Sequence, residues 1–398
     1  GVARGAKLAF IDLFDSEAHE WKIPFNPSSL FSPGMDANAK IHSVSWGSDA
    51  SFPQYGFYDA QFDDYIKDND LLVIVAAGNY VEDQGYTVNS PAVAKNVIAV
   101  GISESYGPDI TPSLLGPNYI SALSPHGPTF DSRLAPHLVA PGHSLLTAQS
   151  DDTVEGECDD TEGVALKKGT SFAAAVVAGS AALIRQYFED GWYPAGRPPA
   201  DDSSSSSSSL EPSGILVKAV LINGAVDMIG RQTLEEGVVK GVAPYDTHQG
   251  FGRVSLTGLR MENVSDLCNI VKDRVAIRPL EVHVVDLAVD FSKGCGGDDG
   301  DSGGTLSVTL AWNDAPSVPN CQKCLLDDLD LLVEDVAAAR MYFPNGLEKE
   351  TDQLNNAERI RVPVKDGDVF KVVVKASNLM SAKQTYALVI AGCVRETS

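Results

Sequence analysis

A glycine, a threonine and a serine stand directly before a long apolar stretch of the chain. The Gly169-Thr170-Ser171 turn leads into a predicted helix rich in alanine and valine. A serine there sits at the positive end of the helix dipole, near backbone N–H groups that have no acceptor within the helix. Such a place suits a nucleophile that generates an oxyanion. Ser171 is therefore a candidate nucleophile. Taken alone, the motif is explained more simply by Thr170 or Ser171 acting as a helix N-cap.

Two further motifs end predicted strands. The apolar run up to Ala77 is followed by Gly78-Asn79, which places a carboxamide at the carboxyl edge of a strand. Asn79 could donate a side-chain N–H to an oxyanion, although Asn after Gly is also common in plain turns. Ser45-Trp46-Gly47 ends another run, and its backbone could pair with an extended peptide. An ordinary strand end is the alternative there.

The elements that position these residues follow from apolar patterning. Four apolar runs of strand length occur early in the chain: Leu8–Leu13, Ile41–Trp46, Leu71–Ala77 and Val97–Ile102. The third run is continuous, as in a strand buried on both faces of a parallel sheet. Helices are predicted over Phe57–Lys67, Gly169–Phe188 and Ile215–Asn223. The alternation predicts an α/β fold with a mostly parallel sheet and helices on both faces.

After residue 262 the pattern changes to short β-rich runs separated by Gly, Pro, Asn and Asp. The runs are Val282–Phe291, Leu306–Trp312, Leu329–Val333, Ile360–Val364, Val369–Val374 and Tyr386–Ile390. Regularly spaced strands with turn signals predict an antiparallel β-sandwich. We therefore expect one domain over residues 1–262, with a flexible serine-rich insertion near 200–210, and a second over residues 263–398.

Composition excludes several classes of protein. The 398 residues include 30 Lys+Arg and 54 Asp+Glu, a net charge of −24, which argues against a nucleic-acid partner. Apolar residues make up 43% of the chain, so wholesale disorder is excluded. The longest apolar candidate for a membrane span, Phe172–Ile184, is shorter than the roughly 20 residues that a span needs. We expect no membrane span.

In combination and order, the motifs resemble those of the subtilisin-like serine proteases, peptidase family S8. The matching stretches are residues 1–8, 45–47, 76–79, 96–101, 140–142 and 169–171. The resemblance covers residues 1–262 and implies a nucleophile at Ser171, with Asn79 and the Ser171 N–H as oxyanion donors. It implies a substrate-binding edge and one wall of a specificity pocket, made by Ser45, Trp46, Gly47, Ala76, Ala77 and Gly78.

The family also uses an aspartate and a histidine, both earlier in the chain than the serine. None of the seven histidines here stands in the family's His-Gly-Thr context. The family places that motif just before the segment that forms residues 1–8 of this chain. We therefore expect a chain truncated before Gly1. Since losing a triad member costs several orders of magnitude in rate, we expect this polypeptide alone to be nearly inactive.

Residues 275–398 resemble the C-terminal jelly-roll-like sandwich of the oxidatively stable alkaline subtilases, a branch that binds calcium. The resemblance rests on Trp312-Asn313-Asp314-Ala315-Pro316 and on Asp328-Leu329-Asp330-Leu331. The acidic cluster in these motifs is a candidate calcium site: Asp314, Asp327, Asp328 and Asp330. Asp328 and Asp330 alternate with leucines and so share one strand face. A solvated acidic face is an equally good explanation of the cluster.

Six cysteines occur, five of them after residue 260. Disulfides in an oxidising compartment and free thiols are both compatible with this spacing. The pair Cys321 and Cys324 could form half of a zinc site, but no second Cys or His pair has matching spacing.

The sequence thus predicts a serine endopeptidase that hydrolyses peptide bonds through an acyl-enzyme, here without the Asp and His of its triad. We expect a secreted or extracytoplasmic monomer that acts on a peptide or protein substrate. The alternative is a non-catalytic binding protein on a degenerate protease fold. The reading frame before Gly1 separates the two, because an upstream Asp and His-Gly-Thr would favour the enzyme.

Overall fold

The central sheet of the protein contains three of the apolar runs that were predicted as strands in the first half of the chain. Its strand order is β11-β10-β6-β5-β4-β3, and β7 also pairs with β5. The strands are β3 (Ile41–Val44), β4 (Leu72–Ala76), β5 (Ile98–Ser103), β6 (Tyr119–Ile120), β7 (Leu138–Pro141), β10 (Gly230–Gln232) and β11 (Val239–Gly241). Four of the pairings are parallel and two are antiparallel. The prediction of a mostly parallel sheet is confirmed.

This computed structural model describes residues 1–15, 17–48, 54–81, 86–106, 115–149, 163–194, 196, 209–235, 238–257, 269–293 and 303–397. Several predicted features lie outside these ranges. They are most of the serine-rich insertion, Cys158, Cys268, Cys295 and most of the expected domain boundary. Below, "the α/β part" denotes the described residues up to 257, and "the sandwich" denotes those from 269 onward.

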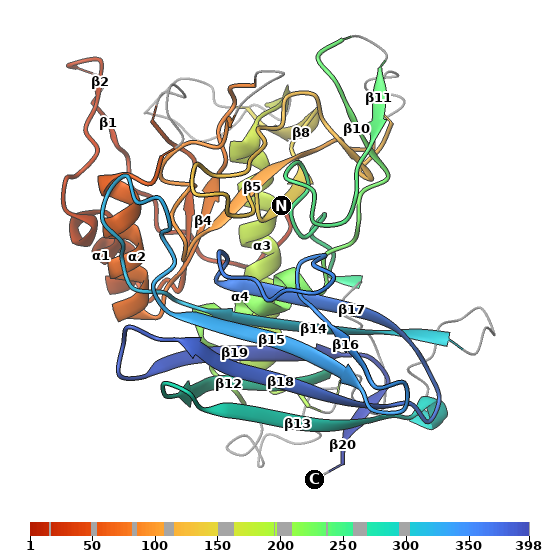
Figure 1. The fold of residues 1–398 in the computed structure, drawn as a ribbon. Coiled ribbons are helices and arrows are strands. Elements are labelled where there is room, and N and C mark those ends of the chain that lie inside the picture. The colour runs from red at the N-terminus through yellow and green to blue at the C-terminus, as the bar shows by residue number, and fades with distance from the viewer. Residues whose placement is uncertain are drawn as a thin grey trace.

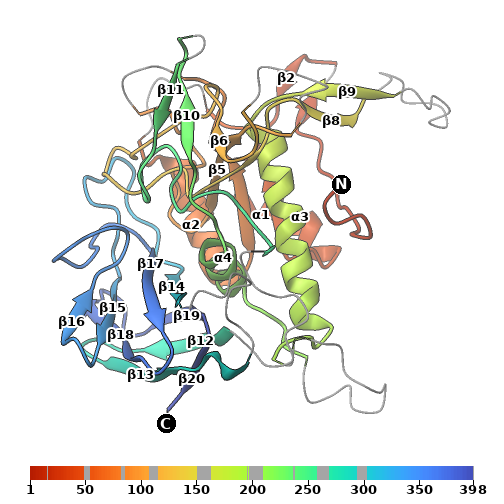
Figure 2. The ribbon, with the colours of Figure 1, turned by 90° about the vertical axis from the view of Figure 1, so that its right-hand side faces the viewer.

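Helices cover both faces of the central sheet, as predicted (Figures 1 and 2). They are α1 (Pro27–Asp36), α2 (Phe57–Asn69), α3 (Thr170–Glu189) and α4 (Gly214–Asn223). Local sequence explains where two of them begin. The Asn26 side chain accepts a hydrogen bond from the Ser28 N–H, and the Ser213 side chain accepts one from Leu216. Both are N-caps that satisfy a first-turn donor.

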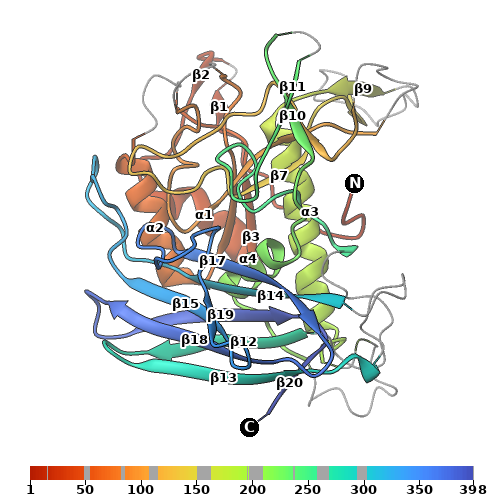
Figure 3. The ribbon, with the colours of Figure 1, turned by 45° about the vertical axis from the view of Figure 1, so that its right-hand side comes forward.

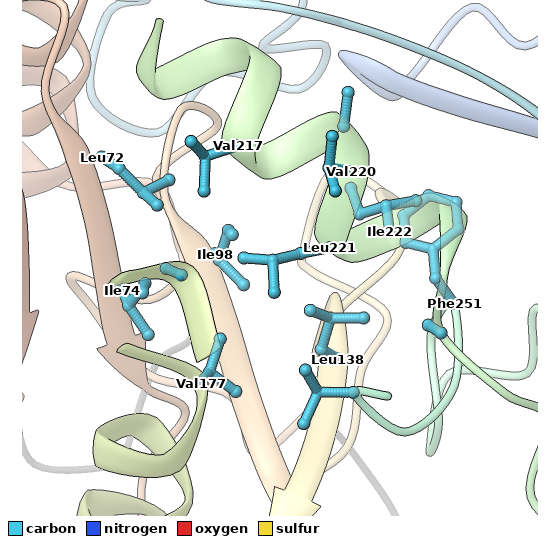
Figure 4. Close-up of a cluster of buried hydrophobic side chains, with 14 of the residues drawn as sticks. Leu72, Ile74, Ile98, Leu138, Val177, Val217, Val220, Leu221, Ile222 and Phe251 are labelled. Carbon is cyan, nitrogen blue, oxygen red and sulfur yellow. The ribbon is translucent and has the colours of Figure 1, made fainter. Parts of the chain in front are cut away.

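The side chains of α3 and α4 form one core with the sheet (Figure 4). Val177 of α3 and Leu221 of α4 face Ile74 and Ile98 from β4 and β5, and all four are fully buried. The other face of the sheet packs on α1 and α2 through a second cluster that contains Val73. Every residue of β4 is buried, which explains its continuous apolar sequence.

Among the described helices, only α3 is long and apolar enough to cross a membrane. Its two ends lie within the α/β part, and it packs along β3, β4, β5 and β7. Ala173, Ala174 and Val177 are fully buried against the sheet. Its apolar composition is therefore that of a core helix.

The prediction of a strand over Leu8–Leu13 is wrong. Only the two residues Phe14–Asp15 form a strand, β1, which pairs with β2 (Glu20–Trp21). Leu8 and Phe10 are 93% and 88% exposed, because no neighbouring strand pairs with this segment. Strand β3 is an edge strand of the central sheet, and among the described residues it pairs with β4 alone. A small hairpin, β8 (Leu145–Ala148) with β9 (Val164–Lys167), precedes α3.

The sandwich consists of two antiparallel sheets, β12-β19-β14-β17 and β16-β15-β18-β13-β20 (Figures 1 and 3). The strands are β12 (Asn269–Ile277), β13 (Val282–Val289), β14 (Gly303–Trp312), β15 (Asp328–Asp335), β16 (Arg340–Tyr342), β17 (Ala357–Lys365), β18 (Val369–Asn378), β19 (Gln384–Ala391) and β20 (Val394–Glu396). A short 3₁₀ turn spans Phe291–Lys293. Both sheets contribute to one buried cluster, which includes Leu310 of β14 and Leu331 of β15.

A fully buried ion pair joins the sandwich to the α/β part. The Lys95 ammonium contacts the Asp314 carboxylate, and neither side chain has any exposed surface. The same Nζ donates to the Cys324 carbonyl at 2.8 Å. Asn96 adds two bonds, because its Nδ2 donates to the Asp314 carbonyl at 2.9 Å and its Oδ1 accepts from the Asp314 N–H at 2.8 Å. The junction is therefore a closed polar network.

Removing one partner of this pair should be strongly destabilising. We expect Lys95→Met to leave the Asp314 charge buried and unpaired and to lower the free energy of unfolding by about 3–5 kcal/mol. Chemical denaturation followed by fluorescence measures the loss. The matched control is Lys272→Met, since Lys272 pairs with Glu396 at the surface and such a pair contributes about 0–1 kcal/mol. Equal, small losses in the two variants would contradict this account.

Candidate functional site

The carboxyl ends of β3 and β4 and the first turn of α3 line one cleft of about 280 Å³. The lining residues are Ser45, Trp46, Gly47, Ser48, Ala76, Gly78, Asn79, Tyr80, Asn89, Thr170 and Ser171. Seven of the eight residues predicted for catalysis and substrate binding are among them. The eighth, Ala77, is fully buried behind the cleft, where its N–H donates to the Val100 carbonyl at 3.0 Å.

Ser171 is the second residue of α3 and is half-buried at the cleft. Its N–H belongs to the first turn, whose donors have no acceptor within the helix. Gly169 is the N-cap, with a φ of 144°, and its N–H donates to the Gly142 carbonyl at 2.8 Å. A side chain at 169 would meet Asn79, because a Cβ there would lie 3.3 Å from Asn79 Oδ1. Glycine therefore lets the helix start close to the asparagine.

Thr170 fixes the orientation of the Asn79 amide. The Thr170 N–H donates to Asn79 Oδ1 at 2.9 Å, and the Thr170 hydroxyl lies 3.1 Å from the same oxygen. That hydroxyl also donates to the Gly78 carbonyl at 2.8 Å. Since the carbonyl side of the amide is engaged, the Nδ2 group of Asn79 is the part left for a ligand. The sequence suggested only a helix cap for Thr170. Its position next to Ser171 was the one signal of a role in the site.

The backbone of residues 45–47 lies at the open edge of the central sheet. Ser45 and Gly47 are exposed, while the Trp46 ring packs against Tyr58 and Phe62 of α2, 6.1 and 6.0 Å away. The open edge stops at Ser48, because the Ser48 N–H already donates to the Ser90 carbonyl at 2.8 Å. An extended peptide could therefore form main-chain hydrogen bonds along this edge.

Asn89 lies between the two glycines of the cleft. A Cβ on Gly47 would lie 2.9 Å from Asn89 Oδ1, and a Cβ on Gly78 would lie 3.1 Å from the Asn89 side chain. The Nδ2 of Asn89 donates to the Ser48 carbonyl at 2.7 Å, whereas its Oδ1 is buried with no hydrogen-bond partner among the described residues. The Asn89 side chain thus backs the wall of the cleft at Gly47 and Gly78.

No histidine, aspartate or glutamate of the described part of the chain lines this cleft. The seven histidines are His19 between β1 and β2, His42 in β3, His126 and His248 with stacked rings, His137 and His143 on either side of β7, and His283 in β13. Burial lowers the pKa of His42 to about 4 and holds that of His137 well below its usual range. Among its described lining residues, the cleft therefore has a hydroxyl and amide donors but no side-chain base.

The predicted acidic cluster separates into two groups. Asp314 pairs with Lys95, and Asp327 accepts hydrogen bonds from the Met380 and Ser381 N–H groups at 2.7 and 2.9 Å. Their charges are therefore already compensated. Asp328 and Asp330 lie close to two carboxylates that the sequence did not single out, Asp352 and Glu358, and the charge of Asp314 also acts on Asp328.

This second group is short of donors. Asp328 Oδ1, Asp330 Oδ1 and Glu358 Oε1 are buried without hydrogen-bond partners in the described residues. Burial and the neighbouring Asp330 raise the pKa of Asp328 to about 6, and burial with Asp352 raises the pKa of Glu358 well above its usual range. Carboxylate oxygens of this kind suit a hard cation. In the described part, however, no three acidic, histidine or cysteine side chains are arranged around one point as a metal site requires.

Cys321 and Cys324 form a disulfide in the loop before β15. Both residues are buried against Tyr55 of the α/β part. The Cys324 N–H donates to Asp131 Oδ2 at 3.2 Å, and its carbonyl accepts from Lys95. Of the alternatives for this pair, the structure contains the disulfide and not half of a zinc site.

Comparison with protein families matches residues 1–252 to the sequence model of the Subtilase family (Peptidase_S8). Among curated proteins, the chain is similar to the "serine protease/ABC transporter B family" proteins tagD and tagA of Dictyostelium discoideum. Each is 26% identical over 98% of this chain. The chain spans only 27% and 26% of those two proteins. The serine protease AprX of Bacillus subtilis is 29% identical over 44% of this chain and 38% of AprX.

Solved structures give weaker similarities. The patellamide maturation protease PatA has a TM-score of 0.39 and 20% identity, over 61% of this chain and 71% of that one. The prenylagaramide maturation protease PagA has a TM-score of 0.38 and 20% identity, over 60% and 68% of the two chains.

The backbone of the cleft should tolerate no side chain at Gly78. Gly78 has a φ of 112°, and a Cβ there would press on Asn89. We expect Gly78→Ala to lower the free energy of unfolding by about 1–3 kcal/mol. The control is Gly241→Ala, since a Cβ on Gly241 meets nothing within 4 Å and should change stability by about 0.5 kcal/mol or less. Thermal unfolding compares them, and an unaffected Gly78→Ala protein would show that the described cleft geometry is wrong.

Proposed function

The chain belongs to the subtilase family, and we propose that it is a serine endopeptidase in which Ser171 forms the acyl-enzyme. The observation that carries the proposal is the pair of bonds from Thr170 to Asn79. These bonds hold a carboxamide beside the helix turn that presents Ser171 and leave its Nδ2 for a ligand. A hydroxyl and two N–H donors around one cleft are the parts that acyl transfer needs.

In the proposed reaction the Ser171 Oγ attacks the carbonyl carbon of the scissile peptide bond. The tetrahedral intermediate carries a negative oxygen, which accepts hydrogen bonds from Asn79 Nδ2 and from the Ser171 N–H. When the C–N bond breaks, the amine leaves with a proton and the acyl group stays on Ser171. Water then hydrolyses the ester and restores the hydroxyl.

The proton transfers in this scheme need a general base and a carboxylate that orients it. We propose that both come from outside residues 1–398, so that these residues alone are nearly inactive. The absence of any histidine or acidic residue from the described cleft lining supports this. Without a base, only the residual catalysis of the oxyanion donors remains, several orders of magnitude below that of a complete triad.

The substrate in this proposal is a peptide or protein segment in extended conformation. Its backbone pairs antiparallel with residues 45–47, and one side chain enters the space between Ala76, Gly78 and Gly47. The net charge of −24 disfavours a nucleic-acid partner, and we propose a monomer.

Calcium is a second part of the proposal, with a changed ligand set. Asp328 and Asp330 remain candidates, joined by Asp352 and Glu358, whereas Asp314 and Asp327 are engaged elsewhere. The buried carboxylate oxygens without hydrogen-bond partners in the described part of the chain support this assignment, because calcium prefers oxygen ligands. In the described residues, no three of these carboxylates surround one point as a metal site requires. Bound there, calcium would neutralise buried negative charge and so stabilise the sandwich.

An extracytoplasmic location is also proposed. The disulfide between Cys321 and Cys324 supports it, since structural disulfides persist mainly in oxidising compartments.

The role of Asn79 predicts a specific kinetic effect. In the active protein, with its base present, we expect Asn79→Ala to lower kcat about 10²–10³-fold with little change in KM, because the donor acts on the oxyanion and not on the bound substrate. Hydrolysis of a fluorogenic peptide measures both constants. Asn69→Ala at the exposed end of α2 is the control. If the two variants retain the same kcat, Asn79 is not an oxyanion donor.

Calcium should stabilise the protein through the second acidic group. At a calcium concentration about 100 times the dissociation constant, we expect a gain of about 2.7 kcal/mol in the free energy of unfolding, seen as a raised melting temperature. Glu358→Gln with Asp330→Asn should abolish the gain. Glu334→Gln, on the same strand as Asp330 but outside the group, should keep it. A calcium response that survives the double substitution places the site elsewhere.

A further inference from the structure

A groove of about 580 Å³ lies between the α/β part and the sandwich, and it shares no lining residue with the cleft. One side is formed by the segments after α4, which contribute Asp227 and Tyr245. The other side is formed by β16, β17 and the loop between them, with Arg340, Lys349, Arg359 and Arg361. Grooves at such junctions are common ligand sites.

The charge of the groove is opposite to that of the protein. Four cationic side chains and two carboxylates, those of Asp227 and Glu348, line it, which leaves a net charge of about +2. The whole chain carries −24. A positive groove on a protein that is negative overall creates a locally positive potential. Such a groove favours negatively charged ligands.

Two arginines of the groove, Arg359 and Arg361, share the carboxylate of Asp227. Arg359 is completely buried; its Nη1 donates to the Ile222 carbonyl at 2.8 Å, which caps the end of α4. Its Nη2 has no hydrogen-bond partner among the described residues and lies 3.6 Å from Asp227 Oδ1. Arg361 Nη1 lies 3.4 Å from that same oxygen. One carboxylate oxygen thus faces two guanidinium groups.

The rim of the groove carries both cationic and apolar side chains. Arg340 stacks over the Tyr342 ring at 4.7 Å, and neither Arg340 nor Lys349 forms an ion pair with another described residue. Met341 and Leu347, also in the lining, are 38% and 40% exposed. A ligand that fills this groove must therefore satisfy positive charge and cover apolar surface at once.

We propose that the groove binds a peptide segment that carries both acidic and apolar side chains. Its carboxylates pair with Arg340 and Lys349, and its apolar side chains cover Met341 and Leu347. A small inorganic anion leaves the apolar side chains exposed, and a long polyanion is repelled by the acidic remainder of the surface. The proposal does not depend on the protease activity, since none of these residues belongs to the cleft.

Binding of defined peptides tests the proposal directly. The probe is a fluorescein-labelled ten-residue peptide of alternating glutamate and leucine, measured by fluorescence anisotropy against the full chain carrying Ser171→Ala, so that it cannot be cleaved. Two matched peptides replace glutamate by glutamine or leucine by serine. We expect both replacements to weaken binding about tenfold or more.

Two charge-matched variants locate the site. Arg340→Gln with Lys349→Gln should weaken binding of the glutamate–leucine peptide about tenfold. Arg278→Gln with Lys383→Gln, exposed residues outside the groove, should leave it unchanged. Circular dichroism checks that both variants fold. Equal affinity for the glutamine peptide, equal affinity for the serine peptide, equal weakening by the two double variants, or competition by inorganic polyphosphate at lower concentration than by the unlabelled peptide would each overturn the proposal.

Discussion

The candidate site depends on one contact, between the first turn of α3 and the end of β4. The Thr170 N–H and hydroxyl hold Asn79 Oδ1 and the Gly78 carbonyl, so the helix start and the strand end cannot move independently. This contact places Ser171 and the Asn79 amide in the same cleft. It also requires glycine at 169, where a side chain would meet Asn79. The chemistry proposed for the cleft follows from this local geometry.

A second polar network connects the sandwich to the region of the cleft. Asp314 of the sandwich binds Lys95 and Asn96, whose backbone N–H groups donate to the Asp63 carboxylate of α2 at 3.2 and 2.8 Å. The Phe62 ring beside Asp63 in turn packs on Trp46 at the cleft. Asp63, Lys95, Asn96 and Asp314 are each buried and hydrogen-bonded, as buried polar groups must be to avoid a large desolvation cost. The sandwich is therefore part of the support of the cleft.

The sequence predicted what depends on local pattern and missed what depends on distant partners. Continuous apolar residues identified β4, and the alanine-rich run identified α3, because burial alone sets those patterns. Leu8–Leu13 has the same apolar character but no neighbouring strand, so it does not form one. Asp314 and Asp328 are close in sequence, yet Asp314 pairs with Lys95 whereas Asp328 lies near Glu358. Only folding brings Lys95 to Asp314 and Glu358 to Asp328, and spacing along the chain cannot show either.

The central claim is that Ser171 is the nucleophile of this cleft. It is tested most directly by treating a preparation that hydrolyses peptides with a fluorophosphonate and locating the adduct by mass spectrometry. The account predicts a single adduct on Ser171 and loss of hydrolysis in proportion to labelling. An adduct on another serine, or full inhibition with Ser171 unmodified, would contradict it.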